Sequence, residues 1–282
     1  MSEKVLLDQY QEEGYLLARG LFSPTEAAQY REHFMQLRTS GTYPLDHLGV
    51  DTDKSDPILK YPRMTHIQRW DTLGRQCLTD PRLARWMALL TGQAPLLVQG
   101  MVYFKPPGSR GQALHQDQFY LKAQPGTCMA AWMALEAADE ENGCLQVVPG
   151  SHLLPMLCTQ KADTTLSFTD VGVPVPAGLE AVSVPMEPGD AIFFNGSLIH
   201  GSPPNTSADR FRLAITGHYI GADARQVAKY YQPALSMEGR ELWLEISEGG
   251  GPCGVWVDHQ GRPVVEVREG WAWRPEAQGI RG

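Results

Sequence analysis

Residues 191–220 read AIFFNGSLIHGSPPNTSADRFRLAITGHYI, and this stretch indicates the fold. An apolar run ends at His200, a connection rich in Gly, Pro and Asn follows, and an alternating run then covers residues 211–219. Short β-prone runs separated by such turn signals are typical of antiparallel sheets. We therefore expect a buried strand that delivers its last residue, His200, to the interior, followed by a second strand.

Similar runs recur upstream, from residue 95 onward. Glycine, proline and asparagine separate them, and no segment of helical period lies between most of them. This pattern favours an antiparallel sandwich or barrel. We predict a mainly β fold with flanking helices, whose core is a double-stranded β-helix of the jelly-roll, cupin-like form. The upstream runs cover residues 94–105, 128–136, 144–149 and 179–186.

Two helices are predicted before the β-rich part. Ser23 can cap a helix and Glu26 completes a capping box, so we expect a helix over residues 23–38. A second helix is expected between Asp80 and Gly92, where apolar residues recur at helical spacing. We expect both helices to pack outside the β core.

The remaining segments are consistent with one domain over residues 1–282. Residues 39–60 are rich in turn formers and charge, and they predict a long surface segment. Residues 221–282 hold four tryptophans among many glycines and are too apolar for a disordered tail. We expect this C-terminal extension to fold back onto the core, because no stretch has the composition of a linker.

Composition restricts the class of partner and the compartment. The 282-residue chain carries a formal charge of −8, whereas a nucleic-acid groove needs clustered Lys and Arg. Its five cysteines are scattered without a C-x-x-C pair, as in a reduced cytosolic protein. The acidic N-terminus does not resemble a signal peptide, and no run approaches the ~18 apolar residues of a membrane span. We expect a soluble cytoplasmic protein with a small-molecule substrate and with neither nucleic acid nor membrane as partner; its oligomeric state stays open.

His115 and Asp117 form the pattern most indicative of chemistry. They stand two residues apart after a probable strand, and alternate side chains of an extended chain project to one face. Such a pair is common by chance, so a third ligand is needed, and His200 supplies it at the end of a predicted buried strand. Two histidines and one carboxylate leave other coordination positions open, which suits non-haem Fe(II) oxygenases.

An arginine downstream of His200 suits a second ligand. 2-Oxoglutarate chelates a metal at one end and leaves a carboxylate at the other, which a planar guanidinium can bind with two hydrogen bonds. In the alternating run FRLAITGHY, Arg212 shares a face with Thr216 and His218, while apolar residues face the other way. Arg212 is therefore the candidate anchor. Arg210 has the same parity and is the alternative, although a surface salt bridge also accounts for it.

Taken together, these residues resemble those of the phytanoyl-CoA dioxygenase family of Fe(II)/2-oxoglutarate oxygenases. The match runs from about residue 8 to 220. It rests on five strings in the right order: YQEEGYLLARGLFSPTE, MVYFKPPGSRGQALHQD, AAWMALEAADEENGCLQVVPGSH, EPGDAIFFNGSLIHGSPPNTS and FRLAI.

The resemblance implies both a site and a reaction. It implies iron at His115, Asp117 and His200, with 2-oxoglutarate held by Arg212 and contacted by further residues of the family's motifs. Because members that become halogenases lack the carboxylate ligand, Asp117 favours hydroxylation of an unactivated C–H bond, with O2 consumed and succinate and CO2 released. The further 2-oxoglutarate contacts implied are Met101, Trp132 and Ser202.

Other functions remain as alternatives. Desaturation, cyclisation or epimerisation would use the same cofactors and differ in how the substrate lies. A non-catalytic jelly-roll binding protein would not need the three candidate ligands and Arg212 together. A zinc hydrolase would leave Arg212 without a purpose, and no well-placed general base is evident beyond the ligands. The sequence does not identify the substrate.

Several further histidines and basic residues are less specific. His152 follows a Pro-Gly turn and is interpreted as structural, since most histidines are not ligands. His218 is on the same face of the predicted strand as Arg212, so we expect it to point inward. There it would contact the substrate or fill polar space. Residues 60–69 place basic groups near the mouth of the site, where they bind an anionic group or form a solvated face. These groups are Lys60, Arg63, His66 and Arg69.

Overall fold

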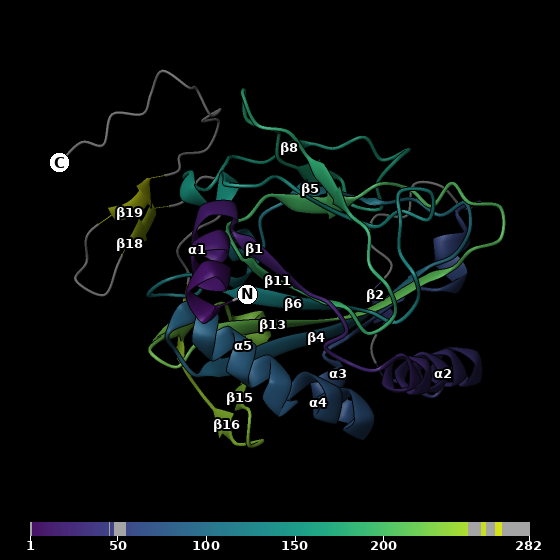
Figure 1. The fold of residues 1–282 in the computed structure, drawn as a ribbon, viewed down its shortest axis with the longest axis horizontal. Coiled ribbons are helices and arrows are strands. Elements are labelled where there is room, and N and C mark those ends of the chain that lie inside the picture. The colour runs from purple at the N-terminus through teal and green to yellow at the C-terminus, as the bar shows by residue number, and fades with distance from the viewer. Residues whose placement is uncertain (1, 45, 48–54, 248–254, 258–262, 267–282) are drawn as a thin grey trace.

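The computed structural model describes residues 2–44, 46–47, 55–247, 255–257 and 263–266. Within this part of the chain, two antiparallel sheets lie face to face, and helices cover the outer side of the larger sheet (Figure 1). This is the predicted mainly β fold with a double-stranded β-helix core. Of the helices described, none is long and apolar enough to cross a membrane.

The larger sheet forms the base of the fold. In the described residues it has nine strands. Seven follow the order β1 (Tyr15–Ala18), β11 (Ala191–Asn195), β6 (Met129–Ala134), β13 (Arg212–Gly221), β4 (Pro95–Lys105), β15 (Ala234–Ser236) and β16 (Glu241–Leu242). In addition, β3 (Arg63–Thr65) pairs with β4, and β2 (Asp46–His47) pairs with β3. Along β13, Leu213 and Ile215 face the helices, whereas Arg212, Thr216 and His218 line an internal cavity. This alternation confirms the predicted parity of the strand.

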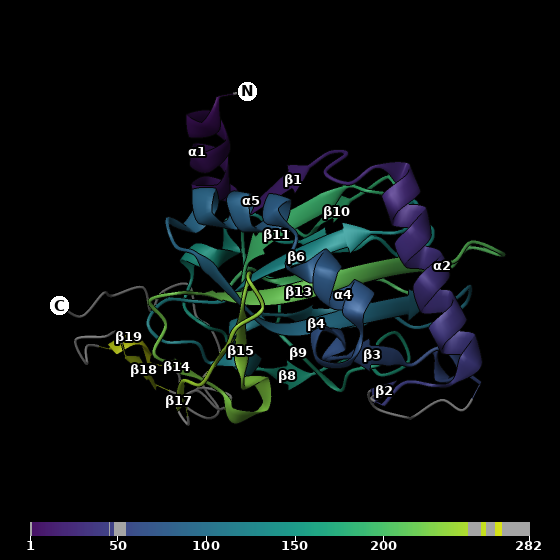
Figure 2. The same cartoon turned by 90° about the horizontal axis from the view of Figure 1, so that it is seen from below.

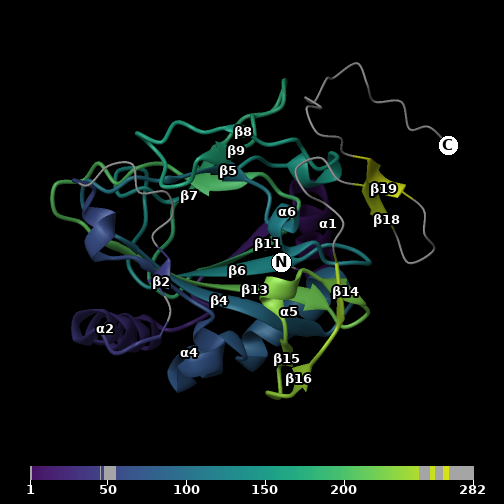
Figure 3. The same ribbon diagram turned by 180° about the vertical axis from the view of Figure 1, so that it is seen from behind.

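The smaller sheet faces the inner side of the larger one (Figure 3). Its described strands follow the order β10 (Val182–Val184), β7 (Leu145–Val147), β12 (His200–Ser202) and β5 (Gln112–His115). Trp132 and Ile192 of the larger sheet share one buried cluster with Val147 of the smaller. Where β5 and β12 pair, polar side chains replace this apolar filling.

The apolar run 191–200 is not one strand, contrary to the prediction. Strand β11 ends at Asn195, and the chain turns through Gly196 before His200 opens β12 in the other sheet. The Asn195 side chain accepts a backbone N–H two residues on at 2.8 Å, and a Cβ at Gly196 would collide with the Cys128 sulfur. This turn carries the chain between the sheets, so His200 reaches the interior from the opposite layer.

Helices cover the outer face of the larger sheet (Figure 2). Phe34 and Met87 of two of them share one buried core with Leu213 of β13. The predicted helices 23–38 and 80–92 correspond to α2 and α5, and α2 begins with the expected capping box. The sequence patterns missed the other three. The helices are α1 (Glu3–Glu13), α2 (Pro24–Ser40), α3 (Ile67–Trp70), α4 (Thr72–Leu78) and α5 (Pro81–Thr91).

The prediction of a surface segment over residues 39–60 is wrong at its C-terminal end. Asp56 and Ile58 are only 5% and 4% exposed. Asp56 forms an ion pair with Arg110, and both side chains are almost fully buried. Residues 48–54 lie outside the described part of the chain. The charge in this stretch therefore reflects in part a buried pair rather than a solvated loop.

The beginning of the C-terminal extension packs against the core. Strand β15 pairs with β4, and Tyr231 and Ala234 are buried. Trp243 is 73% exposed, so this tryptophan does not contribute to the core. Trp271 and Trp273 lie outside the described residues. The single-domain organisation of the whole chain stays a prediction.

Short elements complete the described chain. They are α6 (Gln118–Leu121), the strand pairs β8 (Gln160–Lys161) with β9 (Val171–Gly172), β14 (Gln226–Val227) with β17 (Glu245–Ile246), and β18 (Val255–Val257) with β19 (Pro263–Glu266), and the 3-10 turns η1 (Pro57–Lys60), η2 (Ser151–Leu153) and η3 (Lys229–Tyr231).

The buried Asp56–Arg110 pair predicts a large effect of its disruption. Asp56→Ala leaves a buried guanidinium without its carboxylate, which lowers the free energy of unfolding by about 3–5 kcal/mol. Asp8→Ala is the control, because Asp8 pairs with Lys4 on the exposed side of α1 and such pairs contribute about 0–1 kcal/mol. Denaturant titrations of both variants measure the difference; equal losses would contradict a structural role for the buried pair.

Candidate active site

Two histidines meet where β5 and β12 pair. His115 is the last residue of β5 and His200 the first of β12, and the register places them directly opposite each other. Their ring centroids are 4.2 Å apart. Both residues are buried. The third predicted ligand, Asp117, follows two residues after His115 and precedes the short helix α6.

The Asp117 carboxylate lies between the two rings. Its Oδ1 is 3.5 Å from His115 Nε2 and its Oδ2 is 3.6 Å from His200 Nε2. One donor atom from each of the three residues fits within a span of 4.8 Å. These separations are longer than hydrogen bonds and suit three donors arranged around one ion. The structure thus brings together the three residues that the sequence singled out.

Backbone carbonyls orient both rings. His115 Nδ1 lies 2.9 Å from the Ala113 carbonyl oxygen, and His200 Nδ1 lies 3.0 Å from that of Leu198. A proton on each Nδ1 satisfies these contacts and leaves the Nε2 lone pairs directed at the centre, as in metal-ligating histidines. The Gln112 amide nitrogen lies 3.1 Å from His115 Nε2 and can donate to it in the metal-free state.

Charge around Asp117 favours its ionised form. Burial raises the pKa of this carboxyl, but the neighbouring His218 and His200 outweigh burial and hold the pKa well below its ordinary value. His218 Nε2 is 3.1 Å from Asp117 Oδ2, so His218 points inward as predicted and contacts the carboxylate on its far side. Burial lowers the pKa of His200 to about 4, which keeps its ring neutral near pH 7.

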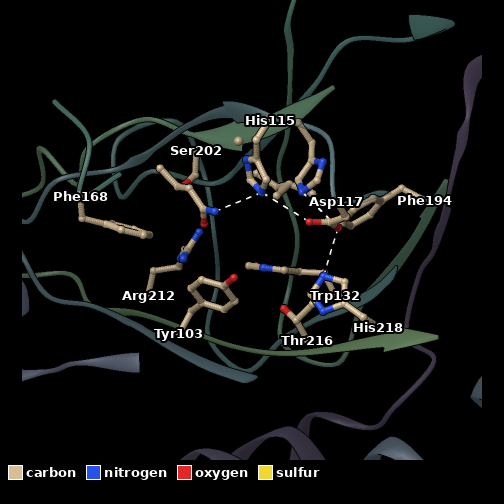
Figure 4. Close-up of a pocket in the computed structure, with 14 residues that line it drawn as sticks. Tyr103, His115, Asp117, Trp132, Phe168, Phe194, Ser202, Arg212, Thr216 and His218 are labelled. Atoms are coloured by element: carbon tan, nitrogen blue, oxygen red, sulfur yellow. Dashed lines mark hydrogen bonds and ion pairs between the residues drawn. The ribbon is translucent and has the colours of Figure 1, made fainter. Parts of the chain in front are cut away.

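Arg212 lies in the same cavity as the His–Asp–His cluster (Figure 4). Its guanidinium carbon is 5.3 Å from the centre of the Trp132 ring, and Nη1 donates to the Gly143 carbonyl at 3.1 Å. Arg212 Nε is buried without a hydrogen-bond partner, and so is Thr216 Oγ1. Burial lowers the pKa of Arg212 to about 10, so it stays charged. Buried polar atoms are normally hydrogen-bonded, and these orphaned donors therefore suit an absent anionic ligand.

Lys105 lies behind the wall of this cavity, where it contacts Ser202, and sequence reasoning missed it. It pairs with Arg212 in the β4–β13 register, and its Nζ donates to Ser202 Oγ at 2.9 Å, to the Gly143 carbonyl at 3.2 Å and to the Pro203 carbonyl. Lys105 is fully buried, and burial together with Arg212 lowers its pKa well below the usual value. The alternation of side chains along β4 was the available signal. Lys105 has the same parity as Met101 and Tyr103, which face the interior.

Met101 lies beside an adjoining cavity. That cavity has a volume of about 290 Å³ and is also lined by His115 and Asp117, whereas Arg212 and Ser202 belong to the first cavity. Met101 therefore stands nearer the histidine end than the arginine end of the site. A contact with the distal carboxylate of 2-oxoglutarate does not follow from this position.

The alternative anchor, Arg210, is engaged elsewhere. Its guanidinium forms ion pairs with Asp139 and Glu141, and all three side chains are at least 38% exposed. His152 lies 3.1 Å from the Gln11 carbonyl oxygen and lines neither of the two cavities. These two residues therefore have the surface and structural positions that the less specific interpretations predicted.

The basic residues of the N-terminal part divide between surface and interior. Lys60 and Arg69 are exposed, and Arg69 donates to the Gln232 carbonyl at 2.7 Å. His66 is buried with neither ring nitrogen hydrogen-bonded, and its ring packs against Tyr230 at 4.7 Å between centroids. Arg63 is buried and lines the adjoining cavity.

The fold and the site together define a class of protein. A buried His–Asp–His cluster with open positions, beside a buried arginine in a double-stranded β-helix, is the arrangement of non-haem Fe(II) oxygenases that use 2-oxoglutarate. The family model described as phytanoyl-CoA dioxygenase (PhyH) matches residues 10–214. The chain therefore belongs to the phytanoyl-CoA dioxygenase family, as the sequence resemblance predicted.

Curated relatives agree with this assignment. The peroxisomal phytanoyl-CoA dioxygenase of Bos taurus is 30% identical over 237 residues, which cover 77% of this chain and 68% of that protein. Phytanoyl-CoA dioxygenase domain-containing protein 1 of Danio rerio is 29% identical over 274 residues, which cover 78% of this chain and 91% of that protein. Because the bovine relative is peroxisomal by name, the cytoplasmic location of this chain stays a prediction.

Solved structures extend the comparison to cofactors. The non-heme alpha ketoglutarate dependent epimerase SnoN from nogalamycin biosynthesis has a TM-score of 0.65 and 26% identity, over 79% of this chain and 82% of that one. SnoN has also been solved with Fe³⁺, alpha ketoglutarate and nogalamycin RO, with a TM-score of 0.65, 25% identity and coverage of 79% and 85%. This chain is thus an Fe(II)- and 2-oxoglutarate-dependent dioxygenase acting on a small molecule.

The low pKa of His200 predicts acid sensitivity in the metal-free protein. Its folded pKa of about 4 lies below the ordinary 6.5, so unfolding takes up a proton between these values. The stability it contributes is present above pH 6.5 and is lost as the pH falls toward 4. Denaturant titrations after chelation should show wild type losing stability more steeply than His200→Gln, by up to about 1.4 kcal/mol per pH unit. Parallel pH profiles would contradict the assignment.

Proposed function

We propose that His115, Asp117 and His200 hold the iron and that the enzyme hydroxylates an unactivated C–H bond of a small molecule. The observation that carries this proposal is the convergence of two Nε2 atoms and one carboxylate within 4.8 Å. Both Nδ1 atoms are engaged by carbonyls, which leaves the Nε2 lone pairs available. When bound, iron and 2-oxoglutarate supply an oxidant that can break a C–H bond. In the overall reaction, 2-oxoglutarate, O2 and the substrate C–H become succinate, CO2 and a substrate hydroxyl.

We propose that the Arg212 end of the cavity binds the distal carboxylate of 2-oxoglutarate. Arg212 Nε has no partner within the protein and can donate to a carboxylate oxygen. Ser202 Oγ accepts a hydrogen bond from Lys105 Nζ, so the hydroxyl proton of Ser202 is free to point toward the same carboxylate. Trp132 covers the guanidinium and excludes water from this end, which strengthens both hydrogen bonds.

The remaining residues of the cluster orient the ligands. His218 contacts Asp117 Oδ2 and restrains the carboxylate, a role common for groups just outside a metal's ligands. Phe194 packs 4.5 Å from the His200 ring between centroids and limits solvent on that side. Met101 remains a predicted contact of the co-substrate, and from its position it would meet the metal-bound end rather than the distal carboxylate.

A second outcome is supported by one specific observation. SnoN, at 26% identity, is an epimerase by its printed description, although it depends on alpha ketoglutarate. The same iron and co-substrate therefore also serve reactions that leave no oxygen in the product. Desaturation, cyclisation and epimerisation remain alternatives to hydroxylation, and the fate of the O2 oxygens distinguishes them.

Oxygen labelling tests the proposed reaction. With Fe(II), 2-oxoglutarate, ¹⁸O2 and a panel of small molecules, we expect succinate that carries one ¹⁸O atom and a product that carries the other. His115→Ala should abolish this turnover because it removes one of three ligands, whereas His152→Ala should retain it. Labelled succinate with an unlabelled, altered product would favour the alternative outcomes. Turnover by His115→Ala would contradict the ligand assignment.

Arginine variants test the co-substrate anchor. Arg212→Ala should raise the KM for 2-oxoglutarate roughly 10–100-fold, since a hydrogen bond to a charged group contributes about 1.5–3 kcal/mol. Arg210→Ala removes the same charge two residues away, from a surface ion pair, and should leave the KM unchanged. Steady-state kinetics over a range of 2-oxoglutarate concentrations measures both. A larger effect at Arg210 would transfer the role to that residue.

A further inference from the structure

The adjoining cavity is the space left for the organic substrate. His115 and Asp117 line it, so a molecule bound there lies next to the His–Asp–His cluster. Its volume of about 290 Å³ is just below the roughly 300–1,000 Å³ typical of small-molecule sites. This size favours a compact molecule. Tyrosine rings form much of the wall, from Tyr120, Tyr230 and Tyr231.

Arg63 is the one arginine or lysine among the described residues that line this cavity. It comes from β3 and is 7% exposed. Its guanidinium carbon lies 4.5 Å from the centre of the Phe168 ring and 5.4 Å from that of Tyr103. Arg63 also hydrogen-bonds the Tyr103 hydroxyl. A guanidinium has five N–H donors, so one hydroxyl leaves the others available to a ligand.

No carboxylate among the described residues lies within ion-pair distance of Arg63. Asp117 is the only acidic side chain that lines the cavity in this part of the chain, and it belongs to the proposed metal cluster. A buried cation that has no carboxylate to balance its charge destabilises a folded protein. The position of Arg63 beside the His–Asp–His cluster therefore indicates that a ligand balances its charge.

We propose that Arg63 binds an oxyanion group of the substrate, so that the enzyme acts on small organic acids. This inference rests on the proposed function, because it assumes that the oxidised carbon lies near the His–Asp–His cluster. The planar guanidinium, which contacts the Tyr103 and Phe168 rings, can present two parallel N–H donors, and these match a carboxylate or a phosphate. The cavity then has an anion-binding wall at Arg63 and a reacting end at the metal.

Binding of a matched pair of probes tests the proposal. Benzoate and benzamide are nearly isosteric, and only benzoate is an anion. Calorimetry would use the anaerobic Fe(II)-loaded enzyme saturated with 2-oxoglutarate, which blocks the Arg212 end. We expect benzoate to bind wild type at least 10-fold more tightly than benzamide does. Phenylphosphate, run in parallel, tells whether carboxylate or phosphate is preferred.

Variants at Arg63 decide which residue is responsible. Arg63→Met should weaken benzoate binding roughly 10–100-fold and leave benzamide unchanged, as expected for loss of a charge-assisted bidentate contact. Arg63→Lys keeps the positive charge but loses the two parallel N–H donors, so it should retain part of the preference for benzoate over benzamide. Arg69→Gln is the control. Arg69 is exposed and does not line this cavity, and its substitution changes the net charge by the same amount.

Two further readouts separate failure of this inference from failure of the proposed function. The affinity for 2-oxoglutarate should be the same in wild type and Arg63→Met. If neither protein bound 2-oxoglutarate, the proposed function would be overturned instead. The thermal unfolding midpoint of Arg63→Met should not fall, since the substitution removes a buried cation whose charge no carboxylate of the described residues balances. Equal benzoate affinity in wild type and Arg63→Met, or no saturable binding of either oxyanion by wild type, would overturn the role of Arg63.

Discussion

The pairing of His115 with His200 across β5 and β12 is the interaction on which the site depends. Two short strands place the imidazoles opposite each other, and backbone carbonyls engage both Nδ1 atoms. The strands approach closely at Gly201, where a Cβ would lie 2.7 Å from the Gln112 carbonyl oxygen. A larger residue would push the strands apart and separate the rings. Asp117 completes the cluster because the chain turns into α6 directly after β5.

Buried basic side chains are the second organising feature. Lys105 and Arg212 are buried together, and Arg63 is buried next to the adjoining cavity, while Asp117 is the only carboxylate lining either cavity in the described chain. Arg212 stays charged although it is buried, and a buried cation reduces stability unless an anion balances it. 2-Oxoglutarate carries a carboxylate at each end, and ligands that bind only the folded state stabilise it. With Arg212 as the proposed anchor, co-substrate binding would therefore stabilise the folded state.

Sequence patterns predicted those parts of the site that depend on local periodicity. The alternation along β13 correctly turned Arg212 and His218 inward, because strand geometry allows two faces only. The same reasoning failed for the apolar run before His200, where a turn at Gly196 moves the chain between sheets. Apolar content is equally compatible with one strand or two. Lys105 was missed because a buried lysine is rare, and its acceptors come from other elements.

The sequence alone determined the β-rich class, the helices α2 and α5 and the His115, Asp117 and His200 set, since these follow from spacing, capping and residue chemistry. The tertiary structure decided what each side chain meets. It separated Met101 from the Arg212 end, joined Lys105 to Ser202 and enclosed Arg63 in a second cavity. The physical reason is range: a pattern reports neighbours along the chain, whereas burial and charge compensation arise between segments distant in sequence.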